Sequence, residues 1–121
     1  MYQDIKERTF KYSLRIIDLS TRLPRTFSGA ILGKQVLRSG TSIGANIEEA
    51  VAAYGRNDFI YKLNLALQEA RETHYWLRLV EASSMLMANQ LCELIGETEE
   101  IKNILGAIVS KLKKEKFKSQ K

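Results

Sequence analysis

The sequence predicts an all-α protein, an up-down-up-down antiparallel four-helix bundle. The composition favours helix, because Leu, Ile, Ala, Glu, Lys and Arg dominate a chain of 121 residues with one proline and seven glycines. Apolar residues recur three and four positions apart in four long segments. Short connections between these segments make neighbouring helices antiparallel. Residues 1–121 are therefore expected to form a single domain around one core.

The first helix is expected to run from Gln3 to Thr21. Pro24 ends it, because the residue before a proline is biased away from helical geometry. The apolar stripe of this helix consists of Phe10, Leu14, Ile17 and Thr21.

The second helix is expected to begin after Ser28, a suitable N-cap, and to extend to about Tyr54, with Gly55 at the C′ position. Three glycines share one of its faces: Gly33, Gly40 and Gly44. A glycine inside a helix costs about 1 kcal/mol relative to alanine. Small residues at this spacing let a neighbouring backbone approach closely, which can offset that cost. The alternative interpretation is a locally weak helix.

The third helix is the clearest in the sequence and is expected over Asp58 to Ala82, capped by Asn57. Its apolar face consists of Ile60, Leu63, Leu67, Ala70, His74 and Leu77, widened by Phe59, Ala66 and Val80.

The fourth helix follows a turn and cap at Ser83 and Ser84. Its apolar row consists of Leu91, Leu94, Thr98, Ile101, Leu105, Ile108 and Leu112. This row passes Gly96 without a change of phase, which favours one long helix. The alternative is that Gly96 ends a short helix and Thr98 caps another.

The charges are unevenly distributed along the chain. Residues 111–121 hold six lysines and one glutamate, which equals the whole net charge of +5. Residues 1–38 hold eight basic and three acidic groups, whereas residues 39–110 hold five and ten. Two basic segments therefore flank an acidic middle, and a partner attracted by charge would meet the first helix, the start of the second, or the C-terminal helix end.

The basic segments are the positive functional signal, because binding a phosphate backbone needs several cations on one surface. One group of candidates surrounds the first turn of the bundle: Arg22, Arg25, Lys34 and Arg38. The other group forms the terminal run: Lys111, Lys113, Lys114, Lys116 and Lys118. The alternative for the terminal run is a solvated helix end that complements the macrodipole.

The sequence offers no constellation for catalysis, so we expect no enzyme activity, no cofactor and no metal. A di-iron bundle needs Glu-x-x-His on two helices, but His74 is the single histidine and Arg71 precedes it by three residues. His74 is expected to be a hydrogen-bonded packing or interface residue. Cys92 is expected to be a small buried hydrophobe. The glycines fit no phosphate-loop spacing.

Three polar residues of the second helix have structural interpretations. Glu48 and Glu49 point about 100° apart and do not converge, and Glu49 is expected to reach a neighbouring helix and pair with Arg38 or another arginine. Asn46, if turned inward, would fix helix register.

Nothing in the sequence indicates a membrane or secreted protein. No apolar run approaches 18 residues, and residues 1–10 lack a signal core. KLKKEKFK is a poor membrane anchor. A lone cysteine suits the cytoplasm, which is the expected location.

A family resemblance is carried by two segments, LPRTFSGAILGKQVLRSGTSIGANIEEA and RNDFIYKLNLALQEARETHYWLRL. They contain Gln-x-x-Arg, then Ser-Ile-x-x-Asn-Ile-x-Glu, then a polar turn and an aromatic-led helix. These positions are Pro24, Gln35, Arg38, Ser42, Ile43, Asn46, Ile47, Glu49, Arg56, Asn57, Phe59 and Ile60. The pattern resembles the four-helix-bundle family of bacterial 23S rRNA intervening-sequence proteins. The chain departs from many relatives because Ser39 and Gly40 follow Arg38.

The resemblance implies a closed up-and-down bundle that assembles into a homopentameric ring. Accessory variability determinant proteins of diversity-generating retroelements look like distant relatives, and those basic pentamers bind nucleic acid and a reverse transcriptase. By this analogy RNA, DNA or a reverse transcriptase is an expected partner. The motif is interpreted as helix-packing architecture, not an active site: Gly40, Ser42, Ile43, Gly44, Asn46, Ile47 and Glu49.

The sequence thus predicts a non-enzymatic oligomeric module that binds nucleic acid through basic patches. The alternative is a protein-docking adaptor or scaffold ring without nucleic-acid binding. The aromatic residues for such docking are Tyr54, Phe59, Tyr61, Tyr75 and Trp76.

Overall fold

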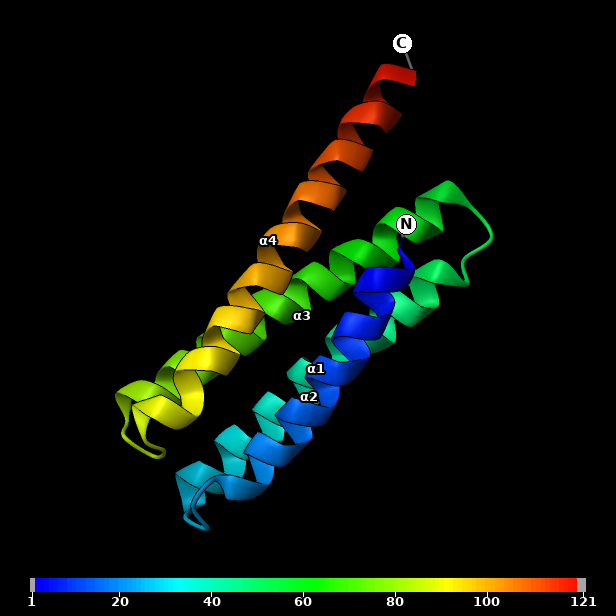
Figure 1. Cartoon of the computed structure of the whole chain (residues 1–121). Helices are drawn as coiled ribbons and strands as arrows, with labels where there is room; N and C mark the ends of the chain where they lie inside the picture. Colours follow the sequence, from blue (N-terminus) through cyan, green and yellow to red (C-terminus); the bar gives the residue numbers. More distant parts are fainter. Residues whose placement is uncertain (1, 120–121) are drawn as a thin grey trace.

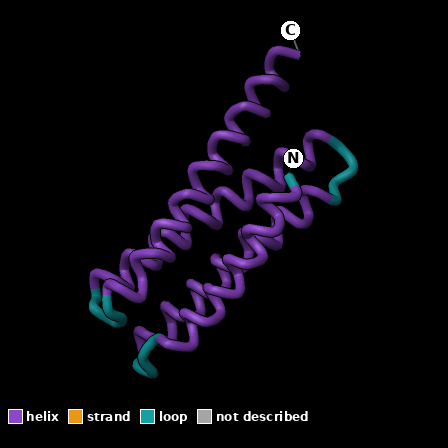
Figure 2. The backbone as a smooth tube through the Cα atoms, viewed as in Figure 1, coloured by secondary structure: helices purple, strands orange, loops and turns teal. Residues whose placement is uncertain are grey.

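The computed structural model describes residues 2–119 and shows four helices joined by short turns. They are α1 (Gln3–Arg22), α2 (Phe27–Val51), α3 (Arg56–Ala82) and α4 (Ala88–Ser119). The helices run alternately up and down, and consecutive helices lie side by side (Figure 1). Figure 2 shows that the described chain is helix and short loops. The predicted all-α four-helix bundle is therefore confirmed.

The start of α2 differs from the prediction by two residues. The N-cap is Thr26, whose Oγ1 accepts a hydrogen bond from the Gly29 amide at 3.1 Å. Ser28 lies inside the first turn. Both residues are good N-cap types, and the local sequence does not choose between them.

The turn between α2 and α3 also differs. α2 ends at Val51, before the predicted Tyr54. Gly55 is the N-cap of α3, with φ of −117° and ψ of 160°, so it is extended and does not end α2 in the left-handed conformation. Asn57, the predicted cap, lies in the first turn of α3.

The buried face of α1 is not the stripe expected from the sequence. Phe10, Leu14 and Ile17 are 62%, 55% and 45% exposed. The buried residues of the helix are Ile5, Thr9, Tyr12, Ile16 and Leu19. Both rows have helical spacing, but the second is longer and continues into the buried Leu23. Burying the longer row removes more apolar surface from water, so α1 packs with this row toward the core.

The expected faces of α3 and α4 largely match the structure. On α3, Thr73 is fully buried, and His74 beside it is only partly buried. α4 passes through Gly96 as one helix and begins at Ala88, since Ser83 and Ser84 form the turn. Val109 is buried where Ile108 was expected.

The glycines of α2 face α1. A Cβ at Gly40 would lie 2.7 Å from Ile16 Cγ2, and one at Gly44 would lie 3.3 Å from the Thr9 carbonyl oxygen. Gly33 similarly faces Leu23 at 3.3 Å. The α1–α2 pair therefore packs closely along this face, and at Gly40 any side chain would overlap Ile16.

Buried hydroxyl groups link the helices inside this core. Tyr12 Oη lies 2.6 Å from Thr98 Oγ1, which joins α1 to α4, and burial raises the pKa of Tyr12 well above its ordinary value. Ser39 Oγ lies 2.8 Å from Thr73 Oγ1, which joins α2 to α3. Among the described residues, no buried side-chain nitrogen or oxygen lacks a hydrogen-bond partner.

Candidate nucleic-acid interface

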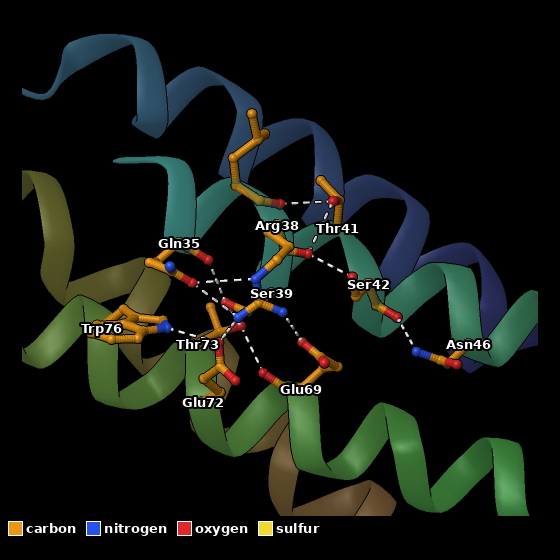
Figure 3. Close-up of polar contacts among 11 residues, drawn as sticks. Gln35, Arg38, Ser39, Thr41, Ser42, Asn46, Glu69, Glu72, Thr73 and Trp76 are labelled. Carbon is orange, nitrogen blue, oxygen red and sulfur yellow. Dashed lines mark hydrogen bonds and ion pairs between the residues drawn. The ribbon is translucent and has the colours of Figure 1, made fainter. Parts of the chain in front are cut away.

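Arg38 is the centre of a polar network between α2 and α3 (Figure 3). It forms ion pairs with Glu69 at 3.4 Å and with Glu72. Its Nε and Nη2 also donate to Gln35 Oε1 at 3.2 and 3.1 Å. Trp76 Nε1 donates to Glu72 Oε2 at 2.9 Å. Gln35 thus positions Arg38, and Arg38 links α2 to two carboxylates of α3.

This arrangement corrects the expected pairing of Glu49 with Arg38. Glu49 is exposed, and Arg38 reaches α3 in the other direction. Two carboxylates offset the charge of Arg38, so it is less available for a phosphate than Arg25 or Lys34, for which the described residues supply no ion pair.

The Ser-Ile-x-x-Asn-Ile segment completes this part of α2. Ile43 and Ile47 are fully buried in the core. Ser42 Oγ donates to the Arg38 carbonyl at 2.6 Å, and Asn46 Nδ2 donates to the Ser42 carbonyl at 2.9 Å (Figure 3). Asn46 therefore bonds to its own helix and does not reach across to another one.

A groove lies where α1 turns into α2. Its volume is about 400 Å³, and its cations are Arg25 and Lys34. Gly29 and Gly33 lie in its wall, and none of its lining residues is acidic. Arg22, expected in the same group, pairs instead with Asp18 at 2.5 Å.

The second basic group lies on the last turns of α4, which extend past the other helices (Figure 1). Lys111 and Lys114 line a hollow of about 380 Å³ with Glu115. Glu115 also pairs with Arg56 at 3.1 Å. Lys113 is exposed and Lys116 partly exposed, whereas the side chain of Lys118 lies outside the described residues.

The structure does not bring the two basic groups together. The α1–α2 turn and the C-terminal part of α4 lie at opposite ends of the bundle (Figure 1). A single copy therefore offers two separate cationic ends.

Two other arginines of α1 face acidic residues of α4. Arg8 Nε and Nη2 donate to Glu97 at 2.7 and 2.9 Å, and Arg8 also pairs with Glu100 at 3.1 Å. The bond from Arg8 lowers the pKa of Glu97 below its ordinary value and raises the pKa of Arg8. Arg15 pairs with Glu93 at 3.2 Å. These cations stabilise the bundle and are not free for a ligand.

The residues weighed for catalysis remain scattered. His74 Nε2 lies 3.3 Å from Glu99 Oε2, between α3 and α4. Cys92 is exposed, which corrects the expectation of a buried thiol. Within residues 2–119, no three His, Cys, Asp or Glu side chains are grouped so that they would hold a metal ion. None of the described helices is both long and apolar enough to cross a membrane.

A larger cleft was not anticipated from the sequence. It has a volume of about 530 Å³ and lies between the start of α1, the start of α3 and the C-terminal half of α4. Ile5, Ile104 and Leu112 are among its apolar residues, and Arg8 and Arg56 lie at it as paired cations. Ile104, which lies outside the predicted apolar row of α4, was the available signal in the sequence.

Comparison with known proteins places the fold in a known group. A family model described as the 23S rRNA-intervening sequence protein matches residues 2–107. A solved structure from Bacteroides thetaiotaomicron VPI-5482, described as a protein of unknown function from the S23 ribosomal protein family, is similar with a TM-score of 0.81. It is 41% identical, over 87% of this chain and 97% of that chain. The search of curated proteins found no significant match.

Proposed function

The chain belongs to the 23S rRNA-intervening sequence protein family, and we propose that it is a non-enzymatic, oligomeric module that binds nucleic acid through its basic ends. RNA or DNA is the proposed ligand, and the cytoplasm is the proposed location. The basic run from Lys111 onward lies beyond the residues that the family model matches.

The groove at the α1–α2 turn is the observation that carries the proposal. Arg25 and Lys34 place two cations on one concave surface without a carboxylate in its lining. The N-terminus of α2 lies at the same end, and its first turn has no acidic residue. The positive end of the helix macrodipole therefore adds to the two side chains, as at many phosphate sites.

The basic end of α4 supplies a second contact of a different kind. Its lysines offer charge on a helix that extends past the rest of the bundle (Figure 1), beside the hollow that Lys111 and Lys114 line. Such contacts bind the backbone of any sequence and weaken steeply with salt. Two cationic ends on one copy suit a long polyanion better than a small ligand.

Self-assembly is part of the proposal, because α1 presents apolar side chains to solvent. Phe10, Leu14 and Ile17 are all about half exposed or more on one stripe. An exposed apolar stripe is typical of a protein interface, and the family resemblance makes a homopentamer the proposed assembly. A ring would repeat each basic end in every copy, and avidity would strengthen weak contacts.

A protein-docking scaffold is the second candidate function. Tyr54 is fully exposed in the turn before α3, and Tyr61 is 58% exposed on that helix. Exposed tyrosines are common binding anchors. The partner by analogy is a reverse transcriptase.

Charge reversal in the groove tests the main proposal. Arg25→Glu with Lys34→Glu should weaken RNA and DNA binding. The slope of log affinity against log salt concentration should become shallower by an amount that corresponds to about one to two phosphate contacts. Lys11→Glu is the matched control, because Lys11 is an exposed cation of α1 away from the groove. Equal affinity in the double variant and the wild type would contradict a role for this groove.

A further inference from the structure

The outward face of α3 carries a stripe with an unusual composition. Its residues are spaced alternately three and four apart, so they follow one side of the helix. They are Tyr61, Asn64, Gln68, Arg71, Tyr75 and Arg78. The stripe contains two tyrosines, two arginines and two amides, and no carboxylate. We refer to these six residues as the α3 stripe.

The α3 stripe is open to solvent. Tyr61 and Tyr75 are 58% and 48% exposed, and Gln68, Arg71 and Arg78 are exposed as well. The buried residues of α3 lie on the other side of the helix. Helix packing therefore does not explain these residue types.

The two arginines of the stripe differ from most arginines of this protein. Within the described residues, neither Arg71 nor Arg78 forms an ion pair, whereas Arg8, Arg15 and Arg38 all do. Arg78 instead lies over Tyr75, with its guanidinium carbon 5.9 Å from the ring centroid. The stripe keeps its positive charge.

The ring of Tyr75 is held in place from one side. It meets Trp76 edge-on, with centroids 5.2 Å apart. Trp76 in turn is fixed by its hydrogen bond to Glu72, which also binds Arg38. One ring of the stripe is thus positioned before any ligand arrives, which lowers the entropic cost of binding on it.

We propose that the α3 stripe binds single-stranded nucleic acid by stacking bases on Tyr61 and Tyr75. Every base has a flat face that stacks on an aromatic ring, whereas a paired base in a duplex does not present it. Arg71 and Arg78 supply phosphate or cation–π contacts, and the amides of Asn64 and Gln68 reach base edges. This inference rests on the proposed nucleic-acid binding and adds the strand class and the residues.

The dimensions of the stripe fit a short stretch of one strand. Tyr61 and Tyr75 are separated by fourteen residues of helix, which is about 21 Å. The apolar stripe of α1 lies on a different helix that does not adjoin α3 in the order of the bundle. The two stripes are therefore separate surfaces of one copy.

The test compares a single strand with a duplex on the full chain. The probes are a fluorescein-labelled oligouridine of about 20 nucleotides and an RNA duplex of the same length, measured by anisotropy. Tyr61→Ala with Tyr75→Ala should weaken binding of the single strand by on the order of tenfold or more and leave duplex binding unchanged. Tyr54→Ala is the matched control, since Tyr54 is an exposed tyrosine outside the stripe, and its affinity should equal the wild type. Arg71→Gln leaves both rings in place and should weaken the single strand as well.

Each other outcome overturns the inference in a distinguishable way. Unchanged single-strand affinity, with loss on charge reversal of Arg25 and Lys34, would leave the proposed function intact and remove the α3 stripe from it. Equal loss for strand and duplex would mean contacts to the backbone without stacking. A smaller molecular mass of the double tyrosine variant would assign the stripe to contacts between copies. Failure of the wild type to bind either probe would overturn the proposed function itself.

Discussion

Gly40 of α2 lies against Ile16 of α1 so closely that a Cβ on the glycine would come within 2.7 Å of Ile16 Cγ2. Ile16 is fully buried, and its Cγ2 is fixed to a branched carbon, so it has little freedom to move aside. The glycine-rich face of α2 is therefore a contact surface between two helices. Its helix-propensity cost is offset by close packing.

Replacing Gly40 tests this contact. Gly40→Ala gains helix propensity but forces the new methyl group into Ile16, and overpacking of this kind costs roughly 1–3 kcal/mol. We expect a lower free energy of unfolding in urea and a lower melting temperature. Gly96→Ala is the control, because nothing lies within 4 Å of a Cβ at that position in α4. It should stabilise the protein by up to about 1 kcal/mol. Equal stability of the two variants would contradict the packing account.

Removing Arg38 should affect stability and not ligand binding. Arg38→Ala leaves Glu69 and Glu72 as neighbouring carboxylates without their cation. Because the network is partly exposed, we expect a loss of about 1 kcal/mol in the free energy of unfolding. Nucleic-acid affinity should stay near the wild-type value. Strong loss of affinity in a variant that keeps its helical circular dichroism would instead assign Arg38 to the binding surface.

The pair of Arg8 and Glu97 predicts a pH dependence of stability. Hydrogen bonds from Arg8 hold the pKa of Glu97 below its ordinary value of 4.5. The unfolded chain therefore binds more protons near and below that pH, so the contribution of Glu97 is full above about pH 4.5 and is lost as the pH falls. Glu97→Gln should cost about 1 kcal/mol at neutral pH. Its deficit relative to the wild type should shrink in acid, and a deficit independent of pH would rule out the ion pair as its cause.

A charge in the apolar stripe of α1 should prevent assembly. Leu14 is 55% exposed, so Leu14→Glu is compatible with the folded monomer. At an interface the new carboxylate would be buried without a partner, which is strongly unfavourable. Light scattering should show a smaller particle than the wild type. Lys11→Glu places the same group on α1 outside the stripe and should not change the mass. An unchanged mass for Leu14→Glu would place the interface elsewhere.

Much of the fold could be predicted, because long amphipathic segments determine where helices form. α3 and the unbroken α4 followed from apolar rows that kept one phase. The face of α1 did not follow, because Phe10, Leu14 and Ile17 have the same spacing as the residues that are buried. Spacing identifies a helix but does not say which of two apolar rows meets the core. The predicted N-cap of α2 was wrong for a similar reason, because Thr26 and Ser28 are both suitable N-cap residues.

Less of the candidate site could be predicted, because its contacts lie between helices. The charge count identified Arg25 and Lys34, but it gave no sign that Arg38 is held by two carboxylates of α3. That pairing depends on the register of α2 against α3, where the buried hydroxyls of Ser39 and Thr73 meet. The separation of the two basic groups to opposite ends follows from the chain direction in the bundle.

The most direct measurement is a titration of RNA and DNA at two salt concentrations, on protein whose mass in solution has been determined. The account predicts an oligomer that binds with strong salt dependence and loses affinity when the chain ends at Ser110 or when Arg25 and Lys34 are reversed in charge. No binding even at low salt would contradict it. The basic end of α4 would then be a solvated helix terminus, and the protein-docking scaffold would become the better description.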